Sequence, residues 1–504
     1  MVSLGDVHTQ VLRSFKSNSI SASSSPASNS VNDILIVNDS IWVGTEKGLA
    51  LTNSNGTSWR HFEQSAGFKG HSISAISVRG SLVWIAEASS FMDNGAIVPA
   101  GEGLHISSNG GSSWTYVPQP VEPKNATIDT LFYGANKIRA LAVPVAAGNI
   151  TYDIAITGAA VWTANYYGML RKSTDNGITW TRVILPPDFL NSISPSDSLK
   201  FDLSPSTGAL GLSENLNHRV FSVYSSSDSV IWVGTAGGIN KSTDGGVSWS
   251  KFSHQNQLKP ISGNFVVALN EQGWKNRRIL WAATVNAVDP DEQRGVSFSD
   301  DGGQSWNTTL IGEFAHNIAF KDSIVYVAAD GGLYRSSDFG VSWIRNGSIV
   351  DQTNFQRVIS SQVSSVATKG DTVWVGGNDG IAYTIDSPTN PFGTTWRVFR
   401  TYQPVGSTSS TYSYPSPFSP DDEVVRIHYG TQGKNSPVTI RIFNYGMQPV
   451  RTLIQNAPRS AAFEQDEIWN GRDDSNNRVS NGVYFYRVDV DGLQPVWGKI
   501  YVIQ

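Results

Sequence analysis

The stretch KSTDGGVSWSKF, residues 241–252, recurs in altered form along much of this chain. Close variants are KSTDNGITWTRV at residues 172–183, SDDGGQSWNTTL at 299–310 and RSSDFGVSWIRN at 335–346. All four share the pattern Ser-x-Asp-x-Gly-x-x-Trp, which we call the box. A pattern that returns many times in one chain indicates an array of similar structural units.

The box occurs in seven copies, which differ in how much of the pattern they keep. The first two copies end at Trp59 and Trp114 and have Ser54 and Asn109 in place of Asp. The seventh ends at Trp396 and carries an insertion after Asp386. The other four copies keep the full pattern, and their Asp and Trp residues are Asp175 and Trp180, Asp244 and Trp249, Asp301 and Trp306, and Asp338 and Trp343.

Each box follows the same series of expected strands. A segment such as VIWVGT precedes it, and an alternating apolar segment such as RVFSVY precedes that segment. Segments in which apolar and polar residues alternate, and which Gly, Asn and Asp bound, are typical of strands. Each unit is therefore predicted to hold four strands, with the box at the turn between the third and the fourth. There Ser and Asp can accept hydrogen bonds from the backbone, Gly can adopt positive φ, and Trp can pack between sheets. We therefore interpret the box as scaffold rather than as a chemical site.

The boxes resemble the BNR or Asp-box repeat, which is found in sialidases, sortilin-type receptors, xyloglucan hydrolases and a photosystem II assembly factor. Over residues 33–400 the resemblance implies a seven-bladed β-propeller, a closed ring that leaves few sheet edges free. Residues 1–32 are expected to supply an N-terminal strand, within QVLRSF at 10–15, and a Ser-rich segment. That strand would pair with the last blade and help to close the ring.

A different pattern begins near the end of the chain. Residues 401–411 have the composition of a linker, and 412–504 alternate strands with Gly, Asn and Asp turns, which favours an immunoglobulin-like sandwich. The strings YPSPFSP and NGVYFYR look like the Ig-like (FlgD-like) module named after the flagellar hook-capping protein. Similar modules end proteins exported by the type IX secretion route, so the resemblance implies export; a purely structural domain is the alternative. The expected fold class is all-β, a seven-bladed β-propeller followed by a small Ig-like β-sandwich.

Composition narrows the partners and the location. The 504 residues carry a net charge of -5, so no basic field attracts phosphates and nucleic acid is not an expected partner. No apolar run is long enough to span a membrane, and the absence of Cys excludes disulfides and thiolate metal sites. The first residues lack the features of a signal peptide. We expect an extracellular or cell-surface protein whose signal has been removed, and an internal location is the alternative.

Four turns between the first and second strands of a unit carry Asp followed by Ser or Thr and an apolar residue. This triplet resembles the O-glycosylation signal of Bacteroidota, which makes the hydroxyl residues candidates for sugar attachment. Asp-Ser is also an ordinary turn pair before a strand, and this second interpretation stays open. The candidate positions are Ser40, Ser229, Ser323 and Thr372.

In a propeller, the loops after the second and fourth strands of each blade lie opposite the boxes, and ligand binding is expected there. Several of these loops are long, which is typical of functional loops. For each residue the alternative is an ordinary solvated side chain. The candidate ligand-binding residues are Glu87, Asp93, Tyr166, Tyr167, His218, Arg219, Asp289, Asp291 and Arg294, with Phe91, Asp188, Phe189 and Glu292 beside them.

Two kinds of chemistry are considered for these loops. Tyr166 and Tyr167 could stack against a sugar ring. Asp289, Asp291 and Glu292 offer oxygens suited to Ca²⁺, but their string DPDEQRG is not an EF-hand loop. We therefore expect no cofactor and no metal, with Ca²⁺ as the alternative.

The preferred functional hypothesis is a non-catalytic surface protein with a binding, adhesion or assembly role. Its partner would be a glycan, a protein or a further copy of the chain. The alternative is a sialidase-like or xyloglucanase-like glycoside hydrolase, which needs two positioned carboxylates or a Tyr nucleophile. Asp93 and Asp289 are the pair that such an enzyme could use. The Arg-Ile/Leu-Pro string that opens sialidase domains is missing, and seven units differ from the six blades of sialidases, so no catalytic residue is assigned.

Overall fold

The computed structural model describes residues 8–9, 13–16, 21–62, 66–93, 96–206, 209–353, 356–401, 411–420, 423–461 and 465–503. Within these ranges the chain is built from β-strands, with short 3-10 turns such as η3 (Leu216–His218). No helix in the same ranges is long and apolar enough to cross a membrane. The predicted all-β class is confirmed.

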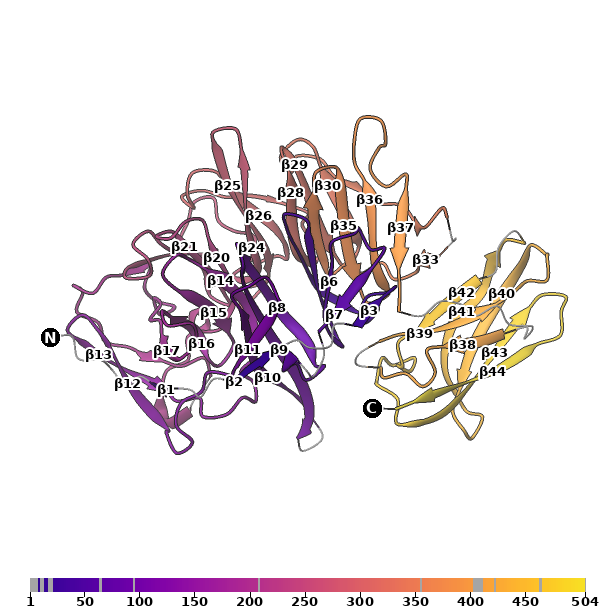
Figure 1. Cartoon of the computed structure of the whole chain (residues 1–504), viewed down its shortest axis with the longest axis horizontal. Coiled ribbons are helices and arrows are strands. Elements are labelled where there is room, and N and C mark those ends of the chain that lie inside the picture. The colour runs from indigo at the N-terminus through magenta and orange to yellow at the C-terminus, as the bar shows by residue number, and fades with distance from the viewer. Residues whose placement is uncertain are drawn as a thin grey trace.

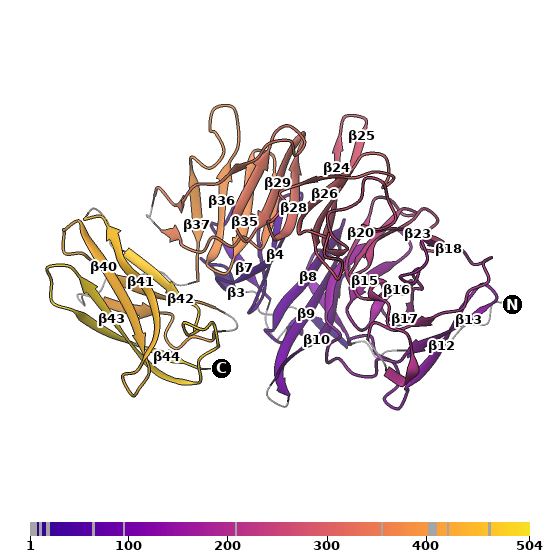
Figure 2. The ribbon, with the colours of Figure 1, turned by 180° about the vertical axis from the view of Figure 1, so that it is seen from behind.

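Seven antiparallel sheets, or blades, follow one another along the chain, and each contains four strands in sequence order. Figure 1 shows these blades side by side, and Figure 2 shows them from behind. The strands of the seven blades are β4 (Val31–Val37), β5 (Ser40–Thr45), β6 (Gly48–Thr52) and β7 (Trp59–His61); β8 (Ser72–Arg79), β9 (Leu82–Asp93), β10 (Ala96–Ser107) and β11 (Ser113–Val117); β14 (Thr151–Ile156), β15 (Val161–Asn165), β16 (Met169–Ser173) and β17 (Thr179–Arg182); β20 (Val220–Ser225), β21 (Ile231–Thr235), β22 (Gly238–Ser242) and β23 (Trp249–Phe252); β24 (Phe265–Trp274), β25 (Arg277–Val285), β26 (Gly295–Ser299) and β27 (Asn307–Thr309); β28 (Ala315–Lys321), β29 (Ile324–Ala329), β30 (Gly332–Ser336) and β31 (Ile344–Arg345); and β34 (Ser365–Lys369), β35 (Thr372–Gly377), β36 (Gly380–Ile385) and β37 (Trp396–Phe399).

The first strands of neighbouring blades contact one another all the way round, from β4 through β8, β14, β20, β24, β28 and β34 back to β4. At the closing contact, the backbone N–H of Ile34 donates to Ser365 Oγ at 2.9 Å, and the N–H of Gly380 donates to the carbonyl of Asn29 at 2.7 Å. The sheets therefore form a closed ring, and the predicted seven-bladed β-propeller is confirmed.

The prediction of how the ring closes is wrong. β2 (Arg13–Lys16), from the segment expected to pair with the last blade, pairs instead with β11 in blade 2. β3 (Ser21–Ser23), from the Ser-rich segment, pairs with β7 in blade 1, and β1 (His8–Thr9) pairs with β17 in blade 3. These strands add a fifth strand to the outer edges of three blades, which removes exposed edges but leaves blades 7 and 1 without a shared strand.

The box forms the same hydrogen bonds in blade after blade, as predicted. In blade 4, Ser242 Oγ donates to Asp244 Oδ1 at 2.7 Å and accepts from the N–H of Gly246 at 2.8 Å, while Asp244 accepts from the N–H of Ser248 at 2.9 Å. Gly246 has φ of +89°, and a Cβ atom there would lie 2.4 Å from the ring of Trp162 in blade 3. A bare Gly is therefore needed both for the turn and for the packing of the neighbouring blade.

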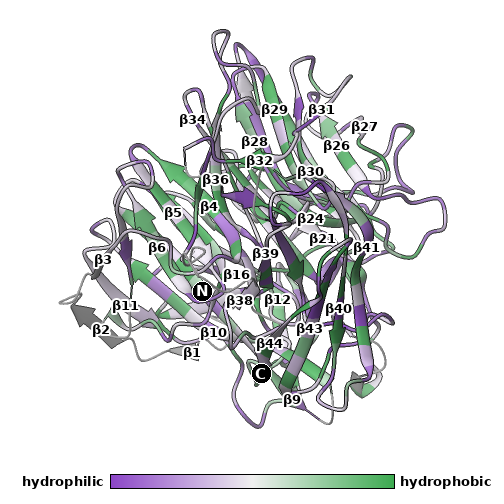
Figure 3. Cartoon of the chain, turned by 90° about the vertical axis from the view of Figure 1, so that its right-hand side faces the viewer, coloured by the Kyte–Doolittle hydropathy of each residue, from purple (hydrophilic) through white to green (hydrophobic). Residues whose placement is uncertain are grey.

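The Trp side chains fill the spaces between blades. Trp59, Trp114, Trp180, Trp249, Trp306 and Trp396 of the boxes are buried, as are the Trp residues of the second strands. Trp343 differs because it is half-buried and donates to Thr309 Oγ1 at 2.7 Å. Figure 3 shows the alternation of hydrophobic and hydrophilic residues along the strands that produces these cores.

Further strands lie outside the regular blades. β12 (Ile128–Tyr133) and β13 (Asn136–Leu141) form a hairpin that pairs with β19 (Asp202–Leu203). β18 (Ser192–Ile193) extends blade 4, and β32 (Ile349–Val350) pairs with β33 (Arg357–Val358). The β12–β13 hairpin lies at one end of the molecule and the C-terminal strands at the other (Figures 1 and 2).

The C-terminal strands form a two-sheet β-sandwich. One sheet has the order β38 (Thr411–Tyr414), β39 (Val425–Tyr429) and β42 (Gln465–Trp469), and the other has the order β41 (Pro449–Arg459), β40 (Ser436–Phe443), β43 (Gly482–Val490) and β44 (Val496–Val502). Both sheets contribute to a single core that contains Ile427, Ile440, Trp469 and Tyr486. The predicted strands in this part of the chain are confirmed.

The sandwich contacts the propeller through a buried group of charges. Arg426 in β39 donates from Nε to Asp379 Oδ1 at 3.0 Å, and Arg400 Nη2 lies 3.5 Å from the same oxygen. All three side chains are almost completely buried. A second ion pair, between exposed Lys47 and buried Glu423 at 3.3 Å, adds a contact with blade 1. Asp379 and Lys47 lie in loops after second strands, so the sandwich covers part of the propeller face opposite the boxes.

Candidate functional site

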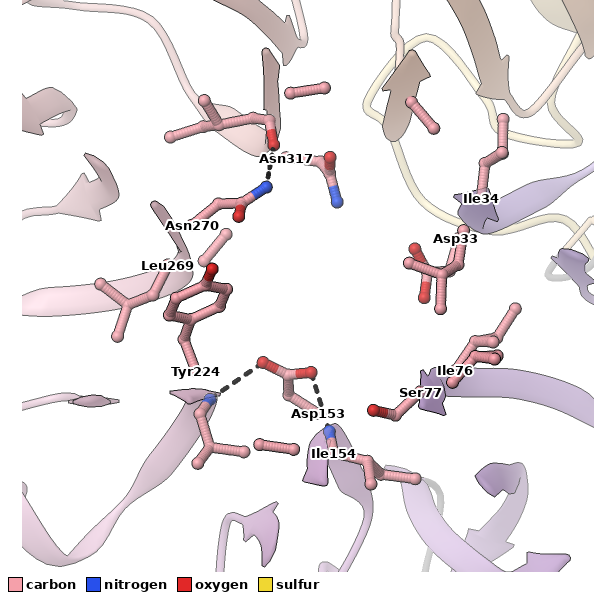
Figure 4. Close-up of a pocket in the computed structure, with 18 of the residues that line it drawn as sticks. Asp33, Ile34, Ile76, Ser77, Asp153, Ile154, Tyr224, Leu269, Asn270 and Asn317 are labelled. Atoms are coloured by element: carbon pink, nitrogen blue, oxygen red, sulfur yellow. Dashed lines mark hydrogen bonds between the residues drawn. The ribbon is translucent and has the colours of Figure 1, made fainter. Parts of the chain in front are cut away.

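The first strands of the blades surround a central channel with a volume of about 750 Å³. Its walls include Asp33, Ser77, Asp153, Asn270 and Asn317, and Figure 4 shows these side chains arranged around the open space. The strands place them there because a propeller brings the start of every blade to the ring axis. Backbone and side-chain polar groups line the channel together with apolar residues of the first strands.

β-bulges shape the loop-side mouth of this channel. In six blades the pairing of the first strand shifts by one residue near its start, for example between Thr151 and Asp153 in blade 3 and between Ala315 and Asn317 in blade 6. A bulge re-aims the extra side chain. Tyr152 and His316 are two such extra residues, and both line the channel. The loop-side mouth is therefore built from residues that the repeat does not hold constant.

Two carboxylates face the channel. Asp153 accepts from the N–H groups of Ile154 at 2.8 Å and of Val223 at 2.9 Å, and so links blade 3 to blade 4. Burial raises the pKa of Asp153 to about 7, because the two N–H donors only partly offset the loss of hydration. Burial likewise raises the pKa of Asp33 to about 6. Near neutral pH these two groups can hold or release protons.

The opposite mouth carries a charged contact between blades. Arg79 in blade 2 donates to Asp228 Oδ1 in blade 4 at 2.7 Å, and the N–H of Gly158 in blade 3 donates to the same oxygen at 2.7 Å. Arg79 and Asp228 both line the channel. Three blades are thus joined on the box side, and the loop side is the better entrance for a ligand.

Aromatic rings lie beside the loop-side mouth in one connected group. The ring centroid of Phe221 is 5.3 Å from that of Tyr152, 4.3 Å from Phe265 and 5.8 Å from Tyr166, and Tyr166 is 4.7 Å from Tyr167. We call these five residues the aromatic arc. Tyr152 is 38% exposed and also lines the channel. The arc therefore runs from the channel wall onto the loop face across blades 3, 4 and 5.

Three of the predicted ligand-binding residues come together at this arc. Tyr166 and Tyr167 belong to it, and the Arg219 guanidinium lies 5.4 Å from the centroid of the Tyr166 ring. Arg219 also forms an ion pair with Glu214 and donates to the carbonyl of Pro205 at 2.7 Å. The arc with its adjacent Arg is consequently close to neutral in charge.

Of the other predicted residues, His218 and Glu87 are internal, and Asp188 is exposed but bound to backbone N–H groups. His218 is buried, and burial lowers its pKa to about 4. Glu87 is fully buried, lies 2.8 Å from His105 Nε2 and accepts from the N–H of Lys69 at 3.1 Å. Asp188 accepts from the N–H groups of Leu216 and Asn217 at 2.7 and 2.8 Å. These groups support loops.

Asp93 and Phe91 lie on a long hairpin that β9 and β10 form in blade 2, while Phe189 is exposed in a loop after blade 3. The hairpin extends beyond the ring in both Figure 1 and Figure 2. Asp289 lies in blade 5, which is not a neighbour of blade 2 in the ring. The two members of the predicted carboxylate pair therefore come from separate parts of the loop face.

Hydrogen bonds to Glu292 and Asp289 hold the acidic loop of blade 5 in place. Buried Glu292 accepts from the N–H groups of Asn264 at 3.0 Å and Ala287 at 2.6 Å, and Gln255 Nε2 donates to Asp289 at 3.0 Å. Asp291 and Arg294 are exposed beside it. Across the described ranges, no three His, Asp or Glu residues are grouped so that they could hold a metal ion. The Ca²⁺ alternative gains no support from this loop.

The candidate glycosylation positions lie in box-side turns. Ser229 is exposed, whereas Ser40, Ser323 and Thr372 are half-buried. Their acidic neighbours make ion pairs between blades: Asp39 lies 2.8 Å from Lys369, and Asp371 pairs with Lys321. A structural role for these Asp residues thus stands beside the glycosylation hypothesis.

Sequence reasoning missed Asp33, Asp153, Tyr152, Phe221 and Phe265. Their signal is present in the strings NDILIV, TYDIAI, VFSVY and FVVALN, where a polar or aromatic residue lies at or next to the start of the apolar positions. The bulge that turns these residues towards the channel mouth leaves no trace in the alternation itself. Attention to the starts of the first strands could have found them.

No model of a known protein family matches the sequence, and no curated protein matches it either. Solved structures that are similar to the chain share its fold. A YCF48 protein bound to D1 peptide has 14% identity and a TM-score of 0.42, with 74% of this chain and 98% of that chain covered. The Niastella koreensis GH74 enzyme has 13% identity and a TM-score of 0.48, with coverages of 95% and 74%. PorZ, a surface component of the type-IX secretion system of Porphyromonas gingivalis, has 13% identity and a TM-score of 0.27, with coverages of 94% and 87%. At these identities the likeness extends to the fold alone.

Proposed function

We propose that this chain is a binding protein whose ligand, a glycan or a protein, lies on the propeller face opposite the boxes. The aromatic arc carries this proposal. It is a connected group of rings at the open end of the central channel, and Tyr152 belongs both to the arc and to the channel wall. Aromatic rings contribute large contact areas at little entropic cost, which is why they dominate binding surfaces.

The charge at the arc favours a neutral ligand. Arg219 is paired with Glu214, so its guanidinium is already neutralised where it meets Tyr166. Deeper in the channel, Asn270, Asn317 and Ser77 offer donors and acceptors for hydroxyl or amide groups. A sugar chain or an uncharged peptide segment, with one apolar face and several hydrogen-bonding groups, fits this combination.

A non-catalytic role is supported by how the predicted carboxylates are used. Glu87 and Glu292 are buried and hydrogen-bonded to backbone groups, which holds loops in place. Asp93 and Asp289 lie in separate blades. General acid–base chemistry on a glycoside needs two carboxyl groups that flank one bond.

Export and a surface location are part of the same proposal. The resemblance of the boxes to BNR repeats and of the sandwich to the Ig-like sorting module supports it. We also propose that the chain divides into a propeller at 33–400, a linker at 401–411 and a sandwich at 412–504. A mass spectrum of the native protein checks this: we expect two mature ends, a sugar mass at Ser229 if the glycosylation hypothesis holds, and recovery from the cell surface or medium.

A glycoside hydrolase is the second candidate, and the channel carboxylates favour it. Asp33 and Asp153 face one cavity, and burial raises the pKa of Asp153 to about 7, a value suited to a general acid. Hydrolysis of neutral glycans that is lost in both Asp33→Asn and Asp153→Asn would support this candidate over pure binding.

The binding proposal is tested with a glycan array and an array of surface-protein peptides, followed by calorimetry of the best ligand. The Tyr152→Ala and Tyr166→Ala variants are expected to weaken binding by about tenfold each, since a stacked ring contributes about 1.4 kcal/mol or more. Val341→Ser, at an apolar residue exposed on the box side, is the matched control and should bind like the wild type. Equal affinity of all four proteins, or a loss in the control alone, contradicts the proposal.

A further inference from the structure

The outer face of the second sandwich sheet carries an unusual set of side chains. Along β43 and β44, Tyr484, Tyr486 and Ile500 point into the core, so the alternate residues point outward. The strand register places Phe443 opposite Phe485, and Phe485 opposite Lys499, in one row. In the row on one side of it, Arg487 lies opposite Trp497. In the row on the other side, Val483 lies opposite Tyr501. We call Phe443, Phe485, Arg487, Trp497, Lys499 and Tyr501 the aromatic–basic face.

Two rings on this face, those of Trp497 and Tyr501, have a cation beside them. The Arg487 guanidinium lies 5.6 Å from the centroid of Trp497, and Lys499 Nζ lies 5.4 Å from the centroid of Tyr501. Trp497 is 44% exposed and Tyr501 is 37% exposed. The ring of Phe443 is 5.4 Å from that of Trp497, which makes the exposed aromatic surface continuous. Contiguous exposed aromatic surface of this kind marks interaction sites.

The face is positively charged on a negatively charged chain. It and its border carry Arg441, Arg487 and Lys499, against a single carboxylate, Asp489, which lies 2.6 Å from Arg487 and 3.4 Å from Arg441. One carboxylate cannot neutralise three cations, so a net positive charge remains. The whole chain has a net charge of -5, which makes this local sign distinctive. The complementary partner is an anion.

We propose that the aromatic–basic face binds an acidic polysaccharide. The apolar face of a sugar ring stacks on Trp497 or Tyr501, and its carboxylate or phosphate pairs with the adjacent Arg487 or Lys499. Rows of side chains on a sheet repeat at about 4.8 Å across the strands, close to the length of one sugar unit, so successive units meet successive strands. This site is separate from the aromatic arc and does not depend on the function proposed for the propeller.

The test uses polygalacturonate as the acidic probe and a neutral galactan of similar length as its comparison. Binding of the full chain is measured by biolayer interferometry at low and at high salt. We expect binding of polygalacturonate that weakens steeply with salt, because ion pairs at an exposed surface are screened. Neutral galactan is expected to bind at least about tenfold more weakly, a difference of about 1.4 kcal/mol.

Two variants separate stacking from charge. Trp497→Ala removes a ring and Lys499→Glu reverses a charge, and each is expected to reduce the affinity for polygalacturonate by about tenfold or more. Trp497→Phe keeps a ring and should retain most of the binding, and Val341→Ser on the propeller should retain all of it. Melting curves for each variant show that the fold is kept.

The proposal is overturned if polygalacturonate does not bind, or if it binds all variants equally. It is also overturned if wild-type chain dimerises in sedimentation experiments, the face variants abolish the dimer, and no polymer binds. That result assigns the face to a second copy of this chain. A failure here leaves the arc proposal intact, because the variants that test the arc lie in blade 3.

Discussion

The two faces of the propeller are built on different rules. On the box side, turns repeat the same bonds, as Ser242 and Asp244 do in blade 4 and Ser336 and Asp338 do in blade 6. On the opposite side, blade 2 has a long hairpin, blade 3 has two Tyr residues in its turn, and blade 7 receives the sandwich. Repetition marks the parts that must satisfy the same packing in every blade. Variation marks the parts that are free to meet a partner.

The sandwich contact sets the largest expected effect on the loop side. Replacing Arg426 with Ala leaves Asp379 buried with the more distant Arg400, so the free energy of unfolding is expected to fall by about 3 kcal/mol. Urea unfolding measures this, and susceptibility to protease reports release of the sandwich. The control is Lys47→Ala, which removes the exposed partner of Glu423 and should cost less, about 1 kcal/mol, because water hydrates the Lys47 ammonium in the folded chain. Equal losses in the two variants would mean that burial does not set the strength of this contact.

On the box side, two adjacent glycines separate turn geometry from packing. Gly246→Ala forces a side chain into positive φ and towards Trp162, and is expected to lower the free energy of unfolding by about 2 kcal/mol. Gly245 also has positive φ, +71°, but a Cβ atom at this position would lie 3.9 Å from its nearest neighbour. Gly245→Ala should therefore cost about half as much, measured by the same urea titration. If Gly245→Ala lowered the free energy of unfolding more than Gly246→Ala does, the contact with Trp162 would not be the reason for Gly at position 246.

Carboxylates on the two sides are expected to respond to pH with opposite signs. Burial raises the pKa of Asp153 from 3.8 to about 7, so the folded chain binds a proton that the unfolded chain has lost. The resulting stability is fully present below 3.8 and is lost as pH rises through about 7. Asp153→Asn should reduce the decline in melting temperature between about pH 4 and about pH 8.

Asp338 in the box provides the opposite case. The hydrogen bond from the Ser342 hydroxyl, followed by that from its N–H, lowers the pKa of Asp338 from 3.8 to about 2. Its contribution is therefore present above 3.8 and is lost as pH falls through about 2. Asp338→Asn should lower the melting temperature at neutral pH and approach the wild type in acid. The same pH profile for both Asn variants would contradict this difference between the faces.

The smallest effect is expected at the charged contact over the box-side mouth. Arg79 and Asp228 are 48% and 60% exposed, and an exposed pair contributes at most about 1 kcal/mol. Arg79→Ala should thus change the urea midpoint only slightly and should not alter ligand binding at the arc. A large loss of stability would show that this contact holds the ring together.

The ring could be predicted from the chain because its repeats are local. A blade consists of four consecutive strands, and each box marks the last turn of a blade. The number of blades therefore follows from the number of Trp-containing turns. The strands β1, β2 and β3 could not be predicted in place, because segments as short as SAS and HT carry no pattern that selects a partner: SAS pairs with blade 1 and HT with blade 3. Their position depends on which outer edges are left open.

The candidate site was predictable only in part. Tyr166, Tyr167 and Arg219 were found because they lie in loops of the expected face, and they meet at the arc. Tyr152 and Asp153 were missed because a bulge, which depends on the opposite strand, lets both of these consecutive residues line the channel. From the sequence, loop carboxylates such as Glu292 were candidates for ligand binding, but in the fold Glu292 accepts hydrogen bonds from backbone N–H groups.

The sandwich contacts both sides of the junction where the first and last blades of the ring meet. Asp379 belongs to blade 7 and Lys47 to blade 1, and both meet residues of the sandwich. The sandwich therefore adds a link between the first and last blades. Without the sandwich, this junction would depend on direct contacts between the two blades, such as that of Ile34 with Ser365, and we expect the ring to open there first.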